Sequence, residues 1–271
     1  MISPTPTPTA LPSAPAIVQR AYQRLRSYGT PPYVVYITNE DGDHHRIAFR
    51  ASDEKMNDVE YNPKRTSLPP ANVYTAFVGP LSITVHEAVV KTTSSPQAAT
   101  TMPQATVAPQ GQTDLMSDLK TIAIVSANAR PIYKMTVHDV ETVNGNQTYK
   151  IELMPTTDPT RYTLRDLWID TSTYDVRRAD YVTRDFNVPD ATVYLTVEFE
   201  PVGPYWIAAH WIAIYHFLGA TPPVYRELRI EKMRFPDTLP DWLFDQQGYE
   251  LHSLAGDADP LAHLFDESPA P

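Results

Sequence analysis

Residues 164–182, with the sequence LRDLWIDTSTYDVRRADYV, constrain the fold of this chain more than any other segment. Their middle, Asp170-Thr171-Ser172-Thr173, consists of residues whose side chains hydrogen-bond to nearby backbone groups and so initiate turns. Aromatic and β-branched residues, which suit a pleated and half-buried surface, lie on both sides of this polar loop: Trp168, Ile169, Tyr174 and Val176. The segment therefore predicts two antiparallel strands joined by a tight loop.

Similar strand patterns recur along the chain and are separated by short breaks. The strongest break is Asn144-Gly145-Asn146, a hairpin signal between two β-rich runs. Consecutive strands with short connections imply an antiparallel meander. The expected strands cover residues 33–38, 45–51, 81–90, 132–143 and 147–154, then the hairpin 164–182, and finally 191–200, 205–218 and 224–235.

Two of these strands indicate how the sheet is covered. Residues 191–200 alternate apolar with mostly polar side chains, which is typical of a sheet with one wet face. Residues 205–218 are apolar on both faces, with Trp206 on one and Trp211 on the other. A strand of that length spans roughly 45 Å, which is too long for an ordinary globular strand without a bend. We therefore expect a long, curved strand in a wrapped sheet.

Helical patterns are few. Residues 15–28 predict a helix with Pro15 in the first turn, Gly29 as the cap and one apolar stripe. A second short helix is expected after Asp114, although its continuation at Ile124-Val125 fits a strand equally well. The fold class is therefore mostly β (α+β): a single curved antiparallel sheet of about ten strands. We expect a half-open barrel, with the N-terminal helix and short helices over its concave face.

The composition excludes several classes of function. A net charge of -10, without any block of Lys or Arg, argues against nucleic acid or an anionic membrane surface as a partner. The chain contains no cysteine, which excludes disulfides, thiolate metal sites and cysteine nucleophiles. No apolar run approaches the ~20 residues that a transmembrane helix needs, so no transmembrane segment is expected.

Low-complexity stretches divide the chain. Residues 1–15 are rich in Pro and Thr and predict an extended tether of the kind that follows an export signal. We therefore expect a periplasmic or otherwise extracytoplasmic protein whose signal sequence has been removed, leaving open an N-terminal lipid anchor. The folded domain is expected at residues 16–249, with a low-complexity insertion at 92–113 and an acidic flexible tail at 250–271.

The last strand and the segment that follows it carry a family resemblance. Residues 225–244 read YRELRIEKMRFPDTLPDWLF, a strand followed by a Phe-Pro…Leu-Pro-Asp-Trp-Leu-Phe closure. Together with the hairpin 164–182 and the short helix before the first strand, this pattern resembles the LolA/LolB-like superfamily of periplasmic lipoprotein carriers, the sensor RseB and outer-membrane lipoprotein-sorting-like proteins. The resemblance covers residues 16–249. It implies a half-open barrel that helices close on its hollow side and that holds acyl chains.

The expected function is therefore non-enzymatic binding or carriage of a lipid or lipoprotein acyl chain by the apolar concave face, as a monomer and without cofactor. An apolar concavity suffices for this, since each buried CH₂ contributes ~0.8 kcal/mol. The alternative is a tethered envelope sensor or scaffold with a filled core and a protein partner. The candidate cavity residues are Val193, Leu195, Val197, Phe199, Trp206, Trp211, Tyr215, Leu228 and Ile230.

Catalytic and metal sites have weaker support. His210 and His216 are expected on one strand face, but ~20 Å apart along a strand they cannot share a metal. Asp166 and Asp170 of the hairpin lie ~13 Å apart on a strand, too far for a glycosidase pair. We expect Asp170 to cap the turn and Asp166 to be solvated. The nearby arginines and aspartates are expected to form ion pairs, with a partner-docking patch as the alternative.

Overall fold

The computed structural model describes residues 11–75, 82–83, 113–128, 131–184, 191–219 and 222–265. The strands are β1 (Tyr33–Glu40), β2 (Asp43–Arg50), β3 (Lys55–Glu60), β4 (Ala71–Thr75), β5 (Ser82–Ile83), β6 (Thr113–Asp114), β7 (Tyr133–Val143), β8 (Asn146–Pro155), β9 (Leu164–Asp170), β10 (Val176–Arg184), β11 (Ala191–Val202), β12 (Tyr205–Phe217) and β13 (Val224–Arg234). The helices are α1 (Ala14–Arg26), α2 (Leu115–Asn128) and α3 (Gln246–Ala255), with short 3-10 helices η1 (Asp241–Phe244) and η2 (Ala262–Phe265).

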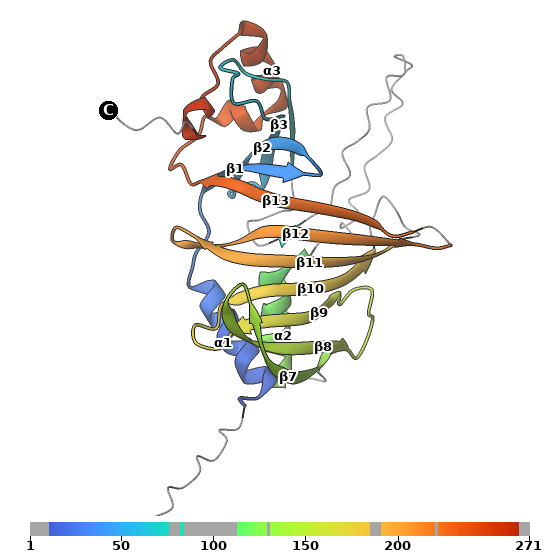
Figure 1. Cartoon of the computed structure of the whole chain (residues 1–271). Helices are drawn as coiled ribbons and strands as arrows, with labels where there is room; N and C mark the ends of the chain where they lie inside the picture. The colour runs from blue at the N-terminus through green and yellow to red at the C-terminus, as the bar shows by residue number, and fades with distance from the viewer. Residues whose placement is uncertain are drawn as a thin grey trace, which may run out of the picture.

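Eleven of the strands form one antiparallel sheet, which Figure 1 shows as a long stack. The order is β4-β3-β2-β1-β13-β12-β11-β10-β9-β8-β7, so the sheet does not close into a barrel. Strands β7 to β13 form the expected meander, and β13 then pairs with β1, which brings the N-terminal strands into the same sheet. The prediction of a single antiparallel sheet that stays open is confirmed.

Strand β12 is continuous, but its pairing with β11 contains an irregularity. It has 13 residues, and its register with β11 shifts between Glu198 and Phe199. Such a bulge bends a strand and increases its twist. The bulge also interrupts the alternation of side chains, so the prediction that Trp206 and Trp211 lie on opposite faces is wrong: both pack in the cluster with α1 and α2.

The helices fall into two groups that cover opposite faces of the sheet. Trp211 of β12, which packs with the cluster of α1 and α2, pairs with Leu228 of β13, and Leu228 pairs with Glu40 of β1. Because side chains alternate along a strand, Val35 and Ile37 of β1 point to the other face. There they pack in one cluster with η1, α3 and η2. Of the helices, therefore, only α1 and α2 lie on the face where the cavity was expected.

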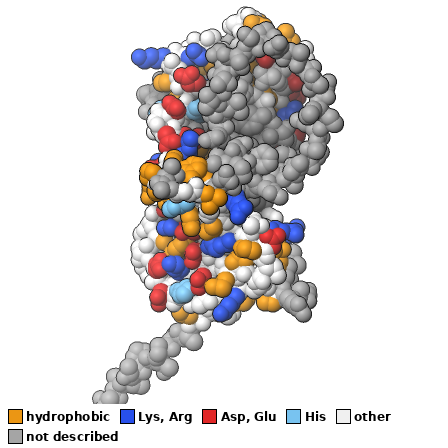
Figure 2. All heavy atoms as spheres, turned by 90° about the vertical axis from the view of Figure 1, so that its right-hand side faces the viewer, with side chains coloured by type: hydrophobic (Ala, Val, Ile, Leu, Met, Phe, Trp, Pro, Cys, Tyr) orange, Lys and Arg blue, Asp and Glu red, His pale blue; other side chains and the backbone are white. Residues whose placement is uncertain are grey.

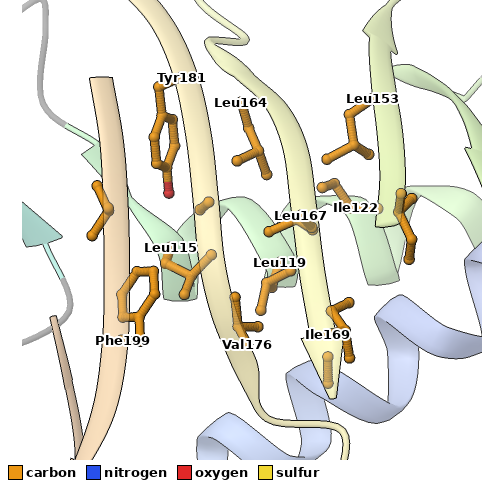
Figure 3. Close-up of a cluster of buried hydrophobic side chains, with 14 of the residues drawn as sticks. Leu115, Leu119, Ile122, Leu153, Leu164, Leu167, Ile169, Val176, Tyr181 and Phe199 are labelled. Atoms are coloured by element: carbon orange, nitrogen blue, oxygen red, sulfur yellow. The ribbon is translucent and has the colours of Figure 1, made fainter. Parts of the chain in front are cut away.

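The main core lies between α1, α2 and strands β8 to β12. Helix α2 contributes Leu115, Leu119 and Ile122, which point toward side chains of β8 to β11 in Figure 3. Helix α1 contributes the predicted apolar stripe, but it ends at Arg26 with Ser27 as its C-cap, so the prediction of Gly29 as the cap is wrong. Leu115 and Leu119 have no exposed surface.

Several elements differ from the sequence-based expectation. Strands β3 and β4 were not predicted, because the sequence of β3, KMNDVE, is mostly polar although Met56, Asn57 and Val59 are buried. Helix α2 includes Ile124 and Val125, so these residues are not strand. Of the expected strand 81–90, only residues 82–83 are described; residues 84–90, most of the insertion 92–113, residues 1–10 and residues 266–271 lie outside the described residues.

The prediction of a flexible tail from residue 250 is wrong for the part that the structure describes. Helix α3 continues to Ala255, and Leu261 and Phe265 are buried in the cluster on β1 to β3. The segment also pairs with the loop before β4 through a bridge between Ser67 and Ala258. A few widely spaced apolar residues anchor an otherwise polar segment, which composition alone does not reveal.

Replacing Leu261 by alanine is expected to destabilise the protein, because the side chain has no exposed surface and truncation leaves a cavity. Such substitutions cost about 2–5 kcal/mol in free energy of unfolding. The matched control is Leu254→Ala, since Leu254 is 86% exposed and should change stability by less than about 0.5 kcal/mol. Urea unfolding measures both, and equal stabilities would contradict the placement of this segment in the core.

Candidate functional site

The nine residues expected to line an apolar cavity belong to the face that α1 and α2 cover, or to its margin. Six of them are buried in the cluster with these helices and expose between 1% and 4% of their surface: Val193, Leu195, Val197, Phe199, Trp206 and Tyr215. The other three are partly buried: Trp211, Leu228 and Ile230. The six buried residues therefore pack in the same cluster as side chains of α1 and α2.

The three partly buried residues, Trp211, Leu228 and Ile230, form what we call the apolar strip across β12 and β13. Trp211 pairs with Leu228, and Ile230 follows two residues later on β13, on the same side. Trp211 packs against the cluster of α1 and α2, whereas Ile230 packs against a second cluster around Val34 and Phe49. The strip thus contacts two buried clusters and is only partly covered itself.

The apolar strip has polar neighbours. The indole Nε1 of Trp211 is buried and has no hydrogen-bond partner in the described part of the chain. Glu40 pairs with Leu228 across the ladder, and Arg226 lies two residues before Leu228. Burial raises the pKa of the Glu40 carboxyl, and the positive charge of Arg226 opposes this shift. Sequence reasoning missed these neighbours, because Glu40 and Leu228 are far apart in the chain.

Helix α1 is attached to the hairpin of β9 and β10 by polar contacts as well as by its apolar stripe. Arg24 Nε donates to Asp175 Oδ1 at 2.9 Å, and the Tyr28 hydroxyl donates to the same oxygen at 2.7 Å. The Tyr28 ring stacks on Trp206 with ring centroids 5.6 Å apart. Burial, together with the hydrogen bond to Asp175, raises the pKa of Tyr28 to about 12.

The described side chains of α2 that face the sheet are apolar. Leu115, Leu119 and Ile122 fit between side chains of β8 to β11 such as Leu153 and Leu167 (Figure 3). Dispersion and burial of apolar surface have no directional requirement. An alkyl chain of similar cross-section is therefore chemically able to replace these contacts.

Asp170 organises the turn of the hairpin, as predicted. Its Oδ1 accepts hydrogen bonds from Ser172 N at 2.9 Å, Ser172 Oγ at 2.7 Å and Thr173 N at 3.1 Å, and its Oδ2 accepts one from Arg177 Nη2 at 3.0 Å. Burial by itself raises the pKa of Asp170, but these hydrogen bonds outweigh it and lower the pKa to about 2. Asp170 is therefore a structural carboxylate that holds the turn.

The other charges near the hairpin are paired with protein groups. Arg178 forms an ion pair with Asp180 at 2.7 Å, whereas Arg165 donates to three backbone carbonyls. The guanidinium of Arg161 lies over the ring of Tyr162. The expectation of a solvated Asp166 is wrong: this residue is half-buried, and burial raises its pKa.

The histidines take part in local contacts. His210 and His216 share a face of β12, as predicted from their spacing. His210 Nδ1 lies 3.0 Å from Glu198 Oε2, and its Nε2 lies 2.8 Å from Glu227 Oε1. Within the described ranges, no group of three His, Asp or Glu side chains has the geometry to hold a metal ion. None of the helices described there is both long and apolar enough to span a bilayer.

Substitution of Asp170 by asparagine is expected to reduce stability in a pH-dependent way. The folded-state pKa of about 2 lies below the ~3.9 of an unfolded aspartate, so the ionised carboxylate stabilises the fold above pH ~4 and loses this effect as the pH falls through about 2. The Asp170→Asn variant should be less stable than the parent at neutral pH, and the gap should narrow on acidification. Urea unfolding at a series of pH values checks this; a pH-independent gap would contradict it.

Most of the chain is similar to solved structures of low sequence identity. Among solved structures, it is similar to an outer membrane lipoprotein-sorting protein domain from Vibrio parahaemolyticus, at 12% identity and a TM-score of 0.39, covering 87% of this chain and 97% of that one. It is similar to a LolA superfamily protein from Nitrosomonas europaea, at 13% identity and a TM-score of 0.33, covering 88% and 99%. It is also similar to the lipoprotein LppX of Mycobacterium tuberculosis, at 12% identity and a TM-score of 0.29, covering 84% and 100%.

Similarity at the level of sequence covers a smaller part of the chain. No curated protein matches the chain. A family model with the description "Uncharacterized protein" matches residues 111–249, slightly more than half of the chain, and covers α2 and the whole meander β7 to β13. The chain belongs to this family of uncharacterized proteins.

Proposed function

We propose that this protein binds a lipid, or the acyl chains of a lipoprotein, on the sheet face that α1 and α2 cover, and that it does so outside the cytoplasm without catalysing a reaction. The observation that carries the proposal is the apolar strip, Trp211, Leu228 and Ile230. It is partly open, and it continues directly into the buried apolar cluster beneath the two helices.

The energy of such binding comes from apolar burial. Each CH₂ of an acyl chain that leaves water contributes ~0.8 kcal/mol, so a chain of ordinary length needs no polar anchor. The strip supplies the entrance, and beside it lie Glu40 and Arg226, the latter in an ion pair with Asp41. The acyl chain passes between the sheet and α2.

Helix α2 is the element that makes room. Its Leu115, Leu119 and Ile122 are held by apolar contacts, which an acyl chain replaces methylene for methylene. Helix α1 stays in place, because Arg24 and Tyr28 bind Asp175 of the hairpin. Ligand binding therefore replaces apolar contacts of α2 with apolar contacts of the acyl chain, and the net cost in free energy is small.

The test uses a fluorescent fatty acid, together with mass spectrometry of lipids extracted from protein purified from a bacterial envelope. Leu228→Arg should weaken binding of the fatty acid by roughly tenfold or more, because it places a charge on the entrance strip. The matched control is Ile212→Arg, since Ile212 is also partly buried on β12 but points to the opposite face. A protein that carries no lipid and takes up no probe, or two variants that bind equally, would refute the proposal.

A second candidate function is a scaffold or sensor that binds an envelope protein. It is favoured by exposed hydrophobic side chains at one end of β11 to β13, which Figure 2 shows gathered at mid-height. Large exposed apolar patches mark sites of interaction with proteins, membranes or ligands. The residues are Tyr194, Leu218, Val224 and Tyr225, which expose between 43% and 84% of their surface.

This candidate predicts a different outcome from lipid binding. Chemical cross-linking in cells should capture one defined envelope protein, and Tyr225→Ser should reduce its recovery, whereas Leu228→Arg should not. Deletion of residues 92–113 tests whether the low-complexity insertion takes part. Unchanged recovery from Tyr225→Ser and from the deletion would count against the scaffold.

A further inference from the structure

A buried arginine on the other face of the sheet is incompletely paired. Arg46 of β2 lies opposite Ile37 and Val59 of the neighbouring strands, beneath the C-terminal segment, and only 4% of its surface is exposed. Burying a charge is costly unless its hydrogen-bonding groups find partners. Each N–H group of this guanidinium is therefore expected to have a partner.

One end of the guanidinium is satisfied. Arg46 Nη1 donates to Asp259 Oδ2 at 2.5 Å, and the other oxygen of Asp259 accepts from Leu261 N at 2.9 Å. The backbone of Asp259 is fixed as well, since its N–H donates to Thr66 O at 3.0 Å. Asp259 is therefore held in place and can serve only this end of Arg46.

The other end has no partner. Arg46 Nε and Nη2 are both buried and form no hydrogen bond within the described residues. These two nitrogens make up one edge of the guanidinium, and their N–H bonds are parallel. This edge matches the two oxygens of a carboxylate in a bidentate pair.

A pocket lies beside Arg46. Its lining includes Arg46, Glu60, Tyr61, Asn62 and Arg65. The space in which the centre of a water molecule can lie is about 20 Å³. A single water needs roughly 10–15 Å³ by the same measure, so a small polar group fits but a bulky one does not. Arg65 and Glu60 are exposed, so their side chains are free to shift and admit a ligand to the buried nitrogens.

We propose that this pocket binds the carboxylate group of a small molecule, with the Nε and Nη2 edge of Arg46 as the recognition element and Arg65 as a second positive charge. A monoanion fits better than a dianion such as phosphate, because Glu60 and Asp259 already place negative charge around Arg46. The site lies on the face opposite to the apolar strip. It is therefore independent of the proposed lipid binding.

The experiment follows the Nε–H signal of Arg46 by nuclear magnetic resonance in the full chain while sodium acetate is added at constant ionic strength. A saturable shift is expected, and sodium chloride should not reproduce it. Arg65→Gln should weaken acetate binding by roughly threefold, and Glu60→Gln should strengthen it by a similar factor, as expected for neighbouring partly exposed charges. Lys64→Gln is the control, because Lys64 is exposed but does not line the pocket.

The design does not require substitution of Arg46, whose loss would leave Asp259 buried without its partner. A shift that stays linear with acetate concentration, or that chloride reproduces, would overturn the proposal. So would saturation by inorganic phosphate with no response to acetate, since that would assign the pocket to a different anion. Equal acetate affinities in the Arg65→Gln, Glu60→Gln and Lys64→Gln variants would also overturn it.

Discussion

The ladder between β13 and β1 is the contact on which the architecture depends. It joins the meander β7 to β13 to the N-terminal strands, although Glu40 and its partner Leu228 are far apart in the chain. A non-local pairing of this kind forms only after a large loop is closed, so its hydrogen bonds and side-chain contacts must offset that entropy. Without it, the chain would consist of two smaller sheets, each with an additional open edge.

The register of this ladder also decides which side chains each face of the sheet carries. Because side chains alternate along β1, the pairing of Glu40 with Leu228 sends Val35 and Ile37 to the face opposite the apolar strip. The C-terminal helices cover that opposite face, while α1 and α2 cover the other. A shift by one residue would exchange the two faces and expose both cores. The two proposed sites are thus separated by the thickness of one sheet.

Both covering helices pack apolar side chains against the sheet. Helix α1 combines an apolar stripe with directional contacts from Arg24 and Tyr28 to Asp175, which fix its position on the hairpin. The sheet-facing side chains of α2 instead rely on apolar packing, which tolerates exchange for another apolar group of similar volume.

The sequence alone determined the local structure. The turn chemistry around Asp170, the alternation from Val193 to Phe199 and the stripe of α1 are short-range patterns, and each predicted its element. Composition excluded thiol chemistry, because the chain has no cysteine. The mostly polar β3 escaped prediction, since its burial comes from neighbours that sequence patterns do not include.

Only the tertiary structure decided which distant residues meet. The order of the sheet, the folding of residues beyond 250 onto β1 to β3, and the packing of α1 and α2 against the expected cavity residues all depend on contacts between remote segments. The same holds for Arg46 and Asp259, which share no local pattern in the sequence. Side-chain alternation and turn chemistry act over a few residues, whereas pairing and packing between remote segments depend on the free energy of the whole fold.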